Sequence, residues 1–457
     1  MSERLRNGRD DADELARIAQ EVCGRARRSE QVEVCVSTGR STTVRAYNGE
    51  IESLRSGHSA AIGVRIIVDG RQGFASAGSL DVDVVAETLS AARSNATFGE
   101  PDPHQGLAEP DGVVPPSLDL CDAAVARVSD ADKIAAAIDL ERRCLSADTR
   151  ISGVRVAAWS DGWSQSVLAS SAGICVQSEH ASCSIGAQPL ATDGHETQIG
   201  YAGDAAWRPD ELDFDRVVTE STEQALGQLG ATKPHSKRLT VVLAPSVAAA
   251  FIAVVAGALA ADSVLKGRSP FADRVGERIA DERLHLFDDP TDPTTLAAAN
   301  FDGEGLAARR NELISAGVLD GFLHNAYTAR RSATVSTGSA VRGTRSVPGV
   351  GTHAPAVAVG DLADEALYGS LGEGVLVRGV SGLHSGVNPT SGDFSVGAWG
   401  HRISGGELAE PFREATIAST LQRMLLGISG IGATAERLTG GTSMPPIVIA
   451  DVALSGV

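Results

Sequence analysis

Hydrophobic positions near the start of the chain switch from helical to strand spacing and back. Apolar side chains recur every three or four positions over residues 11–28 and 81–95, which predicts two helices. Between them Val32, Val34 and Val36 alternate with polar residues, as on a half-buried strand. Two dipeptides in this stretch favour tight hairpin turns: Asn48-Gly49 and Asp69-Gly70. We therefore expect residues 1–98 to form an N-terminal α+β domain.

A change in composition marks the next boundary. Residues 99–118 contain five prolines and few apolar side chains, so we interpret them as a linker. Residues 119–235 then predict a central α+β domain. Its expected elements are a helix, three short antiparallel strands separated by turns at Asp161-Gly162 and Ala172-Gly173, and a second helix: 130–147, 154–160, 164–170, 174–178 and 209–229.

The rest of the chain, residues 236–457, predicts a β-rich C-terminal domain. A strand ends before Pro245, which is well placed in the first turn of a helix. The apolar stretch Val247–Ala261 is short for a membrane span, so a buried helix is expected. Short strands and glycine-rich turns follow, and only residues 362–371 and 416–426 show helical spacing.

Composition narrows the functional class. The 457 residues carry a formal net charge of −18, which argues against direct nucleic-acid binding because phosphates attract Lys and Arg. The first twenty residues lack the apolar core of a secretion signal. We therefore expect a cytoplasmic α+β protein that does not associate with membranes.

Local catalytic motifs are absent from the sequence. No two of the ten histidines lie within ten residues of each other, so a zinc helix of the HExxH kind is excluded. No G-x-S-x-G elbow, phosphate-binding GxxxxGK[ST] loop or dinucleotide fingerprint occurs. Residue chemistry alone thus indicates an α+β protein whose activity is open.

Several longer strings resemble one known family. They include YNGEIESLRSGHSAAIGVRIIVDGRQGFASAGSLD, LKGRSPFADRVGERIA, FDGEGLAARRNELISAGVLDGFLHNAYTARR and GVNPTSGDFSVGAWG. They are distributed over most of the chain, from residue 47 to residue 400, and resemble segments of the TldD/PmbA family in the same order. The resemblance implies an antiparallel architecture whose C-terminal part is barrel-like with flanking helices.

The family has two branches, and this chain is similar to the TldE/PmbA branch. TldD-type chains carry an HExxxH helix just before the KG-S segment, with a further Cys ligand near the C-terminus. Here the matching positions are Ile252, Ala253 and Gly257, whose side chains cannot ligate a metal. No Cys lies in residues 437–454. The resemblance therefore implies no catalytic residue, no metal and no cofactor in this chain, with zinc held by a TldD-type partner.

Two polar segments are candidate contacts for a substrate or for the partner. The first contains His324, Asn325, Tyr327 and Arg330, since Tyr and Arg are frequent interface anchors. The second is the turn with Asn388, Ser391 and Asp393, which is also explained as a tight loop.

The resulting hypothesis is a metal-free subunit of a heterodimeric zinc metallopeptidase. Its substrates would be small unstructured peptides or peptide-like biosynthetic intermediates, and it would be inactive alone. Two alternatives stay open: an independent hydrolase or amidase with a non-local site, and a regulatory binding protein.

Overall fold

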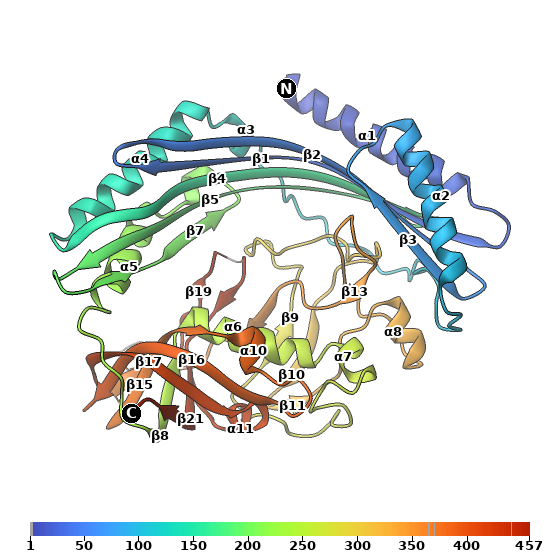
Figure 1. Ribbon diagram of the computed structural model, residues 1–457. Coiled ribbons are helices and arrows are strands. Elements are labelled where there is room, and N and C mark those ends of the chain that lie inside the picture. The colour runs from blue at the N-terminus through green and yellow to red at the C-terminus, as the bar shows by residue number, and fades with distance from the viewer. Residues whose placement is uncertain (1–2, 364–365, 370, 440) are drawn as a thin grey trace.

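The computed structural model describes residues 3–363, 366–369, 371–439 and 441–457, with side chains from residue 12 onward. A long curled sheet from the first half of the chain arches over a C-terminal β-barrel and its loops (Figure 1). The α+β fold is thus confirmed, with a half-barrel sheet first and a closed barrel second. None of the helices formed by the described residues has the length and apolar composition needed to cross a bilayer.

The half-barrel is a seven-stranded antiparallel sheet of unusually long strands. Its strand order is β3-β2-β1-β4-β5-β6, and β7 also pairs with β5. β1 pairs with β4, so the segments predicted as N-terminal and central domains share one sheet. The strands span Glu30–Tyr47 (β1), Glu50–Val68 (β2), Arg71–Ala77 (β3), Ile151–Ser170 (β4), Cys175–Thr192 (β5), Thr197–Ile199 (β6) and Ala202–Ala206 (β7).

Helices cover the two ends of one face of this sheet (Figure 1). At one end, α1 (Glu3–Gly24) and α2 (Val82–Phe98) share a core with Val32, Val34 and Val36. The predicted face of this strand is therefore confirmed. At the other end, α4 (Asp130–Ala147) and α5 (Phe214–Leu226) share a core with Trp159. The short α3 (Ala123–Arg127) lies beside them, and residues 99–122 form neither helix nor strand.

The strand turns were predicted correctly at three places and wrongly at a fourth. Ala172-Gly173 separates β4 from β5, with a positive φ angle at Gly173. Asn48-Gly49 and Asp69-Gly70 have the positive φ angles of tight hairpin turns. Asp161-Gly162, by contrast, lies inside the continuous strand β4. Asp161 pairs with residues of both neighbouring strands, and its carboxylate accepts hydrogen bonds from Trp159 and from Lys133. The sheet thus overrides a dipeptide that favours turns in isolation.

Five strands close the C-terminal barrel. Their order is β17-β16-β15-β8-β21, and β17 pairs again with β21 to complete the ring. Only β8 and β15 run parallel. The strands span Lys237–Leu243 (β8), Glu373–Ser381 (β15), Asp393–Ser404 (β16), Glu407–Thr420 (β17) and Ile447–Ser455 (β21), with β18 (Ile428–Ile431) added on β21.

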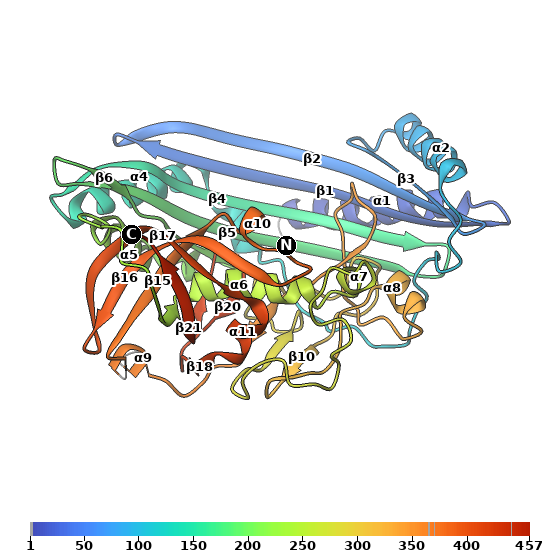
Figure 2. The same cartoon turned by 60° about the horizontal axis from the view of Figure 1, so that its bottom comes forward.

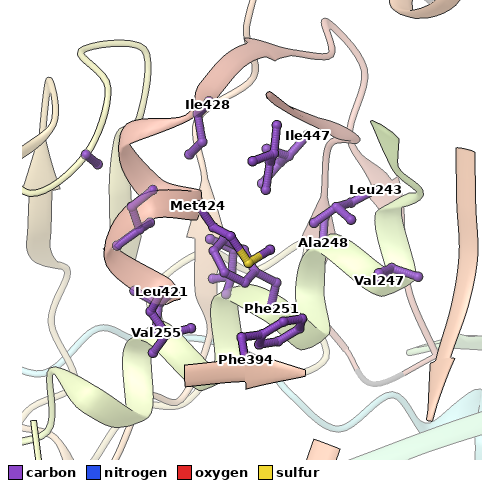
Figure 3. Close-up of a cluster of buried hydrophobic side chains, with 14 of the residues drawn as sticks. Leu243, Val247, Ala248, Phe251, Val255, Phe394, Leu421, Met424, Ile428 and Ile447 are labelled. Carbon is purple, nitrogen blue, oxygen red and sulfur yellow. The ribbon is translucent and has the colours of Figure 1, made fainter. Parts of the chain in front are cut away.

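The helix α6 (Pro245–Ala258) packs against the barrel core, as its apolar sequence predicted. Pro245 occupies its first turn. Phe251 meets Phe394 of β16 edge to face, with ring centroids 6.0 Å apart. Figure 3 shows Phe251 and Val255 converging with Met424 and Leu421 of α11 (Leu421–Leu426).

Three helical predictions need correction, two in the C-terminal part of the chain and one in the segment before it. Residues 416–420 end strand β17, because they pair with β16 and β21, and helix α11 begins only at Leu421. Of the helix predicted over 362–371, the structure shows α9 (Ala366–Gly369), while residues 364–365 and 370 lie outside the described residues. The helix predicted over 209–229 is a 3₁₀ turn at Pro209–Glu211 followed by α5, since Asp213 caps α5 by accepting from the Arg216 N–H.

Short elements lie between α6 and β15 and also between later strands of the barrel region. A small sheet pairs β11, β10, β9 and β14, and the hairpins β12–β13 and β19–β20 project from the C-terminal part toward the half-barrel (Figure 1). These elements span Ala261–Leu265 (α7), Leu286–Asp288 (β9), Asn311–Ser315 (β10), Val318–Leu319 (β11), Ala326–Arg331 (α8), Ala340–Val341 (β12), Gly349–Val350 (β13), Pro355–Val357 (β14), Leu383–Gly386 (α10), Glu436–Arg437 (β19) and Ser443–Met444 (β20).

Candidate functional site

The exposed face of α6 consists of small side chains. Ala253 and Gly257, one turn apart, are both exposed, whereas Ile252 is fully buried in the barrel core. A Cβ atom placed on Gly257 would meet no atom within 4 Å. The three positions that match the HExxxH motif therefore divide into one core residue and two residues on an open, smooth helix face.

This helix face does not fit a metal ion. Methyl groups and a glycine offer no lone pair to a divalent cation. Among the described residues, no group of three or more His, Cys, Asp and Glu side chains is arranged to hold one. Strand β20, in the segment where the resemblance places a cysteine ligand, packs near α6 and contributes Met444 to the core.

The predicted contact residues His324 and Asn325 lie beyond the C-terminal end of α6. Leu323 forms an isolated parallel bridge with Ala260, which follows α6 directly. Asn325 caps α8 by accepting a hydrogen bond of 2.8 Å from the Thr328 N–H. Burial lowers the pKa of His324, so its ring is neutral at pH 7.

Tyr327 and Arg330 fasten the linker to the C-terminal region. The Tyr327 hydroxyl donates to Asp102 Oδ2 at 2.8 Å. Arg330 donates to three linker carbonyls, those of His104, Gly106 and Leu107, at 2.7, 2.6 and 3.1 Å. Their polar groups are thus engaged within the chain, and a contact with substrate or partner stays a prediction for both.

The second predicted segment is an exposed turn beside α6. Asn388 organises it by accepting hydrogen bonds from the N–H groups of Thr390 and Ser391. The Ser391 hydroxyl donates to Asp393 at 2.6 Å. The next residue, Phe394, packs on Phe251 of α6. The turn therefore flanks the middle of α6, whereas His324 lies past its end.

A hydroxyl-lined surface on the sheet was not predicted. On the face that meets the C-terminal region, Ser37 pairs with Ser166, and Ser166 with Ser178. Farther along, Thr43 pairs with Ser160 and Ser160 with Ser184. The Ser37 hydroxyl lies 2.8 Å from that of Thr344, which shows that this face points toward the C-terminal half. The sequence signal is a partial alternation of serines, such as Ser164 with Ser166 and Ser182 with Ser184, and the prediction of two strands in place of β4 divided it.

Buried carboxylates stabilise the loop between the half-barrel and α8. Asp302 accepts hydrogen bonds from the N–H groups of Glu304, Leu306 and Ala340. Burial, reinforced by the nearby Glu304 charge, raises the pKa of Asp302 to about 7. Glu304 accepts from the Ala326 N–H at the start of α8. Both carboxylates are engaged in hydrogen bonds to the backbone, so we assign them a structural role and no catalytic role.

Comparison with known proteins gives matches along nearly the whole chain. Residues 32–96 match domain 1 of the PmbA/TldA metallopeptidases, residues 124–229 their central domain and residues 236–456 their C-terminal domain. The metalloprotease PmbA of Escherichia coli O157:H7 is 27% identical over 430 residues, which are 93% of each chain. A PmbA homologue of Haemophilus influenzae is 28% identical over 426 residues, covering 89% of this chain and 88% of that protein.

A solved structure shows the same fold. TldE of Thermococcus kodakarensis superposes with a TM-score of 0.85 at 24% sequence identity. The superposition covers 97% of this chain and 99% of that one. The half-barrel and the barrel are therefore a shared architecture.

Proposed function

Because this chain belongs to the PmbA/TldD metallopeptidase family, we propose that it is the metal-free, TldE/PmbA-like subunit of a heterodimeric zinc metallopeptidase. A TldD-type partner would hold the zinc ion. The pair would act in the cytoplasm on small unstructured peptides or peptide-like biosynthetic intermediates. The observation that carries the proposal is the side chains of α6 at the motif positions, Ile252, Ala253 and Gly257, which offer no metal ligand.

The shape of the half-barrel supports a partner. β2 pairs with β1 along its length, but β3 covers only its second half, Ile62–Val68. Within the described chain, the other edge of residues 50–61 has no neighbouring strand. Exposed backbone groups on a strand edge invite pairing with a second chain. Tyr47, Ile51 and Leu54, all more than two-fifths exposed, add apolar surface beside this edge.

The hydroxyl-lined face supports a peptide substrate. Serine and threonine hydroxyls both donate and accept hydrogen bonds, so they satisfy the backbone of an extended peptide without selecting its side chains. Ser164 and Ser178 are exposed on this face. The small side chains on the exposed face of α6 leave room beside the helix for a peptide substrate and for the partner subunit.

The test is reconstitution with a TldD-type chain from the same genome. We expect the purified chain alone to hold no stoichiometric zinc and to cleave no peptide, and the co-purified pair to do both. A pair in which the glutamate of the partner's HExxxH motif is changed to Gln controls for contaminating peptidases. Stoichiometric zinc or turnover in the lone chain would instead establish an independent hydrolase.

A further inference from the structure

A cavity of about 500 Å³ lies between α5, the start of α6 and the outer side of the barrel. Its wall carries charges of both signs: Glu220 and Glu223 of α5, Glu436 of β19 and Arg378 of β15. Ala244, Leu376 and Pro446 contribute apolar surface. A cavity of this size suits a small ligand.

A β-bulge directs Arg378 to this wall. On β15, Val377 pairs with Gly400 and Gly379 with Trp399, so Arg378 has no partner in the register with β16. A Cβ atom on Gly400 would lie 1.9 Å from the Leu376 oxygen, and one on Gly379 would lie 2.3 Å from the Trp399 indole. Only glycine fits at both positions, and bulges commonly re-aim a side chain beside a binding site.

Arg378 has no counter-charge in the described chain. Its Nε atom is buried and has no hydrogen-bond partner, and no ion pair joins it to any described carboxylate. His401 lies nearby, and its pKa is lowered by burial first and by the Arg378 charge second. The neighbouring ring is therefore neutral, and a histidine ring has no negative charge that could pair with the guanidinium.

The acidic wall is only partly neutralised. Arg216 pairs with Glu220 at 3.2 Å and reaches Glu436 at 3.9 Å. Glu223 is exposed, and no ion pair engages its carboxylate among the described residues. Among the described residues, the cavity thus holds one carboxylate and one guanidinium that no ion pair engages, and these two groups do not pair with each other.

We infer that this cavity binds a small amphoteric ligand, namely a short peptide with free ends or a free amino acid. The ligand's carboxylate would pair with Arg378, whose guanidinium presents paired donors to such a group. Its ammonium group would face Glu223, and small apolar side chains would rest on Leu376 and Pro446. This site goes beyond the proposed function, because it involves neither zinc nor the exposed Ala253–Gly257 face of α6.

Isothermal titration calorimetry on the purified chain with Ala-Ala-Ala tests the site without any partner. We expect saturable binding, weakened roughly tenfold or more by amidating the C-terminus or acetylating the N-terminus, since each removes one charge contact. Arg378→Gln should weaken the free peptide similarly and remove the effect of amidation. Glu223→Gln should remove the effect of acetylation.

Matched controls separate the site from general charge effects. Arg402→Gln changes a half-buried residue and Glu407→Gln an exposed residue on the same barrel, and both should leave affinity unchanged. Arg378→Lys keeps the charge and should retain part of the affinity if Arg378→Gln proves unstable. The inference is overturned if Ala-Ala-Ala does not bind at millimolar concentration, or if capping either end makes no difference. The calorimetric experiment does not measure the peptidase activity of the reconstituted pair. A negative result for the cavity therefore leaves the proposed function untouched, and the reverse also holds.

Discussion

The Arg65 guanidinium faces the Glu33 carboxylate directly across β1 and β2, with Nε–Oε1 and Nη2–Oε2 distances of 3.0 Å each. Both side chains are almost completely buried. Glu304 approaches the same guanidinium at 3.5 Å, and Arg342 contacts Glu33. Two strands of the half-barrel are thereby joined to two loops of the C-terminal region through one buried set of charges.

Removing one member of this pair should be costly. Glu33→Ala leaves Arg65 buried with a weaker partner, so we expect the free energy of unfolding to fall by about 3–5 kcal/mol. Chemical denaturation followed by circular dichroism measures the change. Glu52→Ala, which breaks an exposed pair with Arg45 in the same hairpin, should cost at most about 1 kcal/mol. Equal losses for the two variants would contradict this account.

Stability should depend on pH through Asp302. Its carboxyl titrates near 3.8 when unfolded, whereas burial raises the pKa of Asp302 to about 7 in the fold. Between pH 3.8 and about pH 7, the Asp302 carboxyl is protonated in the folded chain and ionised in the unfolded chain. The stability contribution is therefore full below about pH 4 and is lost as the pH rises toward 7.

Asp302→Asn isolates this effect, because the amide resembles the protonated acid and cannot titrate. We expect the wild-type chain to lose stability relative to the variant between pH 5 and 7, by at most about 1.4 kcal/mol per pH unit. Denaturation midpoints at pH 5, 6, 7 and 8 provide the comparison. Parallel profiles for the two proteins would show that Asp302 does not titrate in this range.

Local patterns predicted the elements whose own residues determine them. The alternation of Val32, Val34 and Val36 reflects a single buried face, and Asn48-Gly49 tolerates the positive φ angles of its turn. The helix at 130–147 was predicted with the bounds that α4 has, because Ser129 caps its first turn by accepting from the Asp132 N–H. The sequence also showed directly that α6 is apolar and that Ile252, Ala253 and Gly257 cannot ligate a metal.

Pairing between distant segments could not be predicted in the same way. Asp161-Gly162 is held in β4 by strands on both sides, and Thr416 is held in β17 by pairing with Ser455 of β21. The hydrogen bonds of Arg330 to the linker were not predicted, because its three acceptors lie more than two hundred positions earlier in the chain. The cavity at Arg378 likewise requires a bulge that only the register with Gly400 reveals.

Arg330 should control how firmly the linker is held. Arg330→Ala removes three hydrogen bonds to linker carbonyls, so we expect faster cleavage by thermolysin before Leu107, a residue that is buried while the linker is held in place. The loss in stability should be about 1.5–3 kcal/mol, as for hydrogen bonds to a charged group. The exposed neighbour Arg331, changed to Ala, is the matched control and should leave cleavage slow. Unchanged proteolysis of Arg330→Ala would mean that other contacts hold the linker.

The smooth face of α6 should matter to the pair but not to the lone chain. Ala253→Leu adds a large side chain at an exposed helix position, so we expect the unfolding free energy of the isolated chain to change by no more than about 0.5 kcal/mol. In the reconstituted pair the same side chain would project toward the space that substrate or partner occupies, and peptide turnover should fall at least about tenfold. Ala135→Leu makes the same change at an exposed position of α4 and should leave turnover intact. If both variants support full turnover, the α6 face takes no part in the shared site; if Ala253→Leu also destabilises the lone chain, the face is structural.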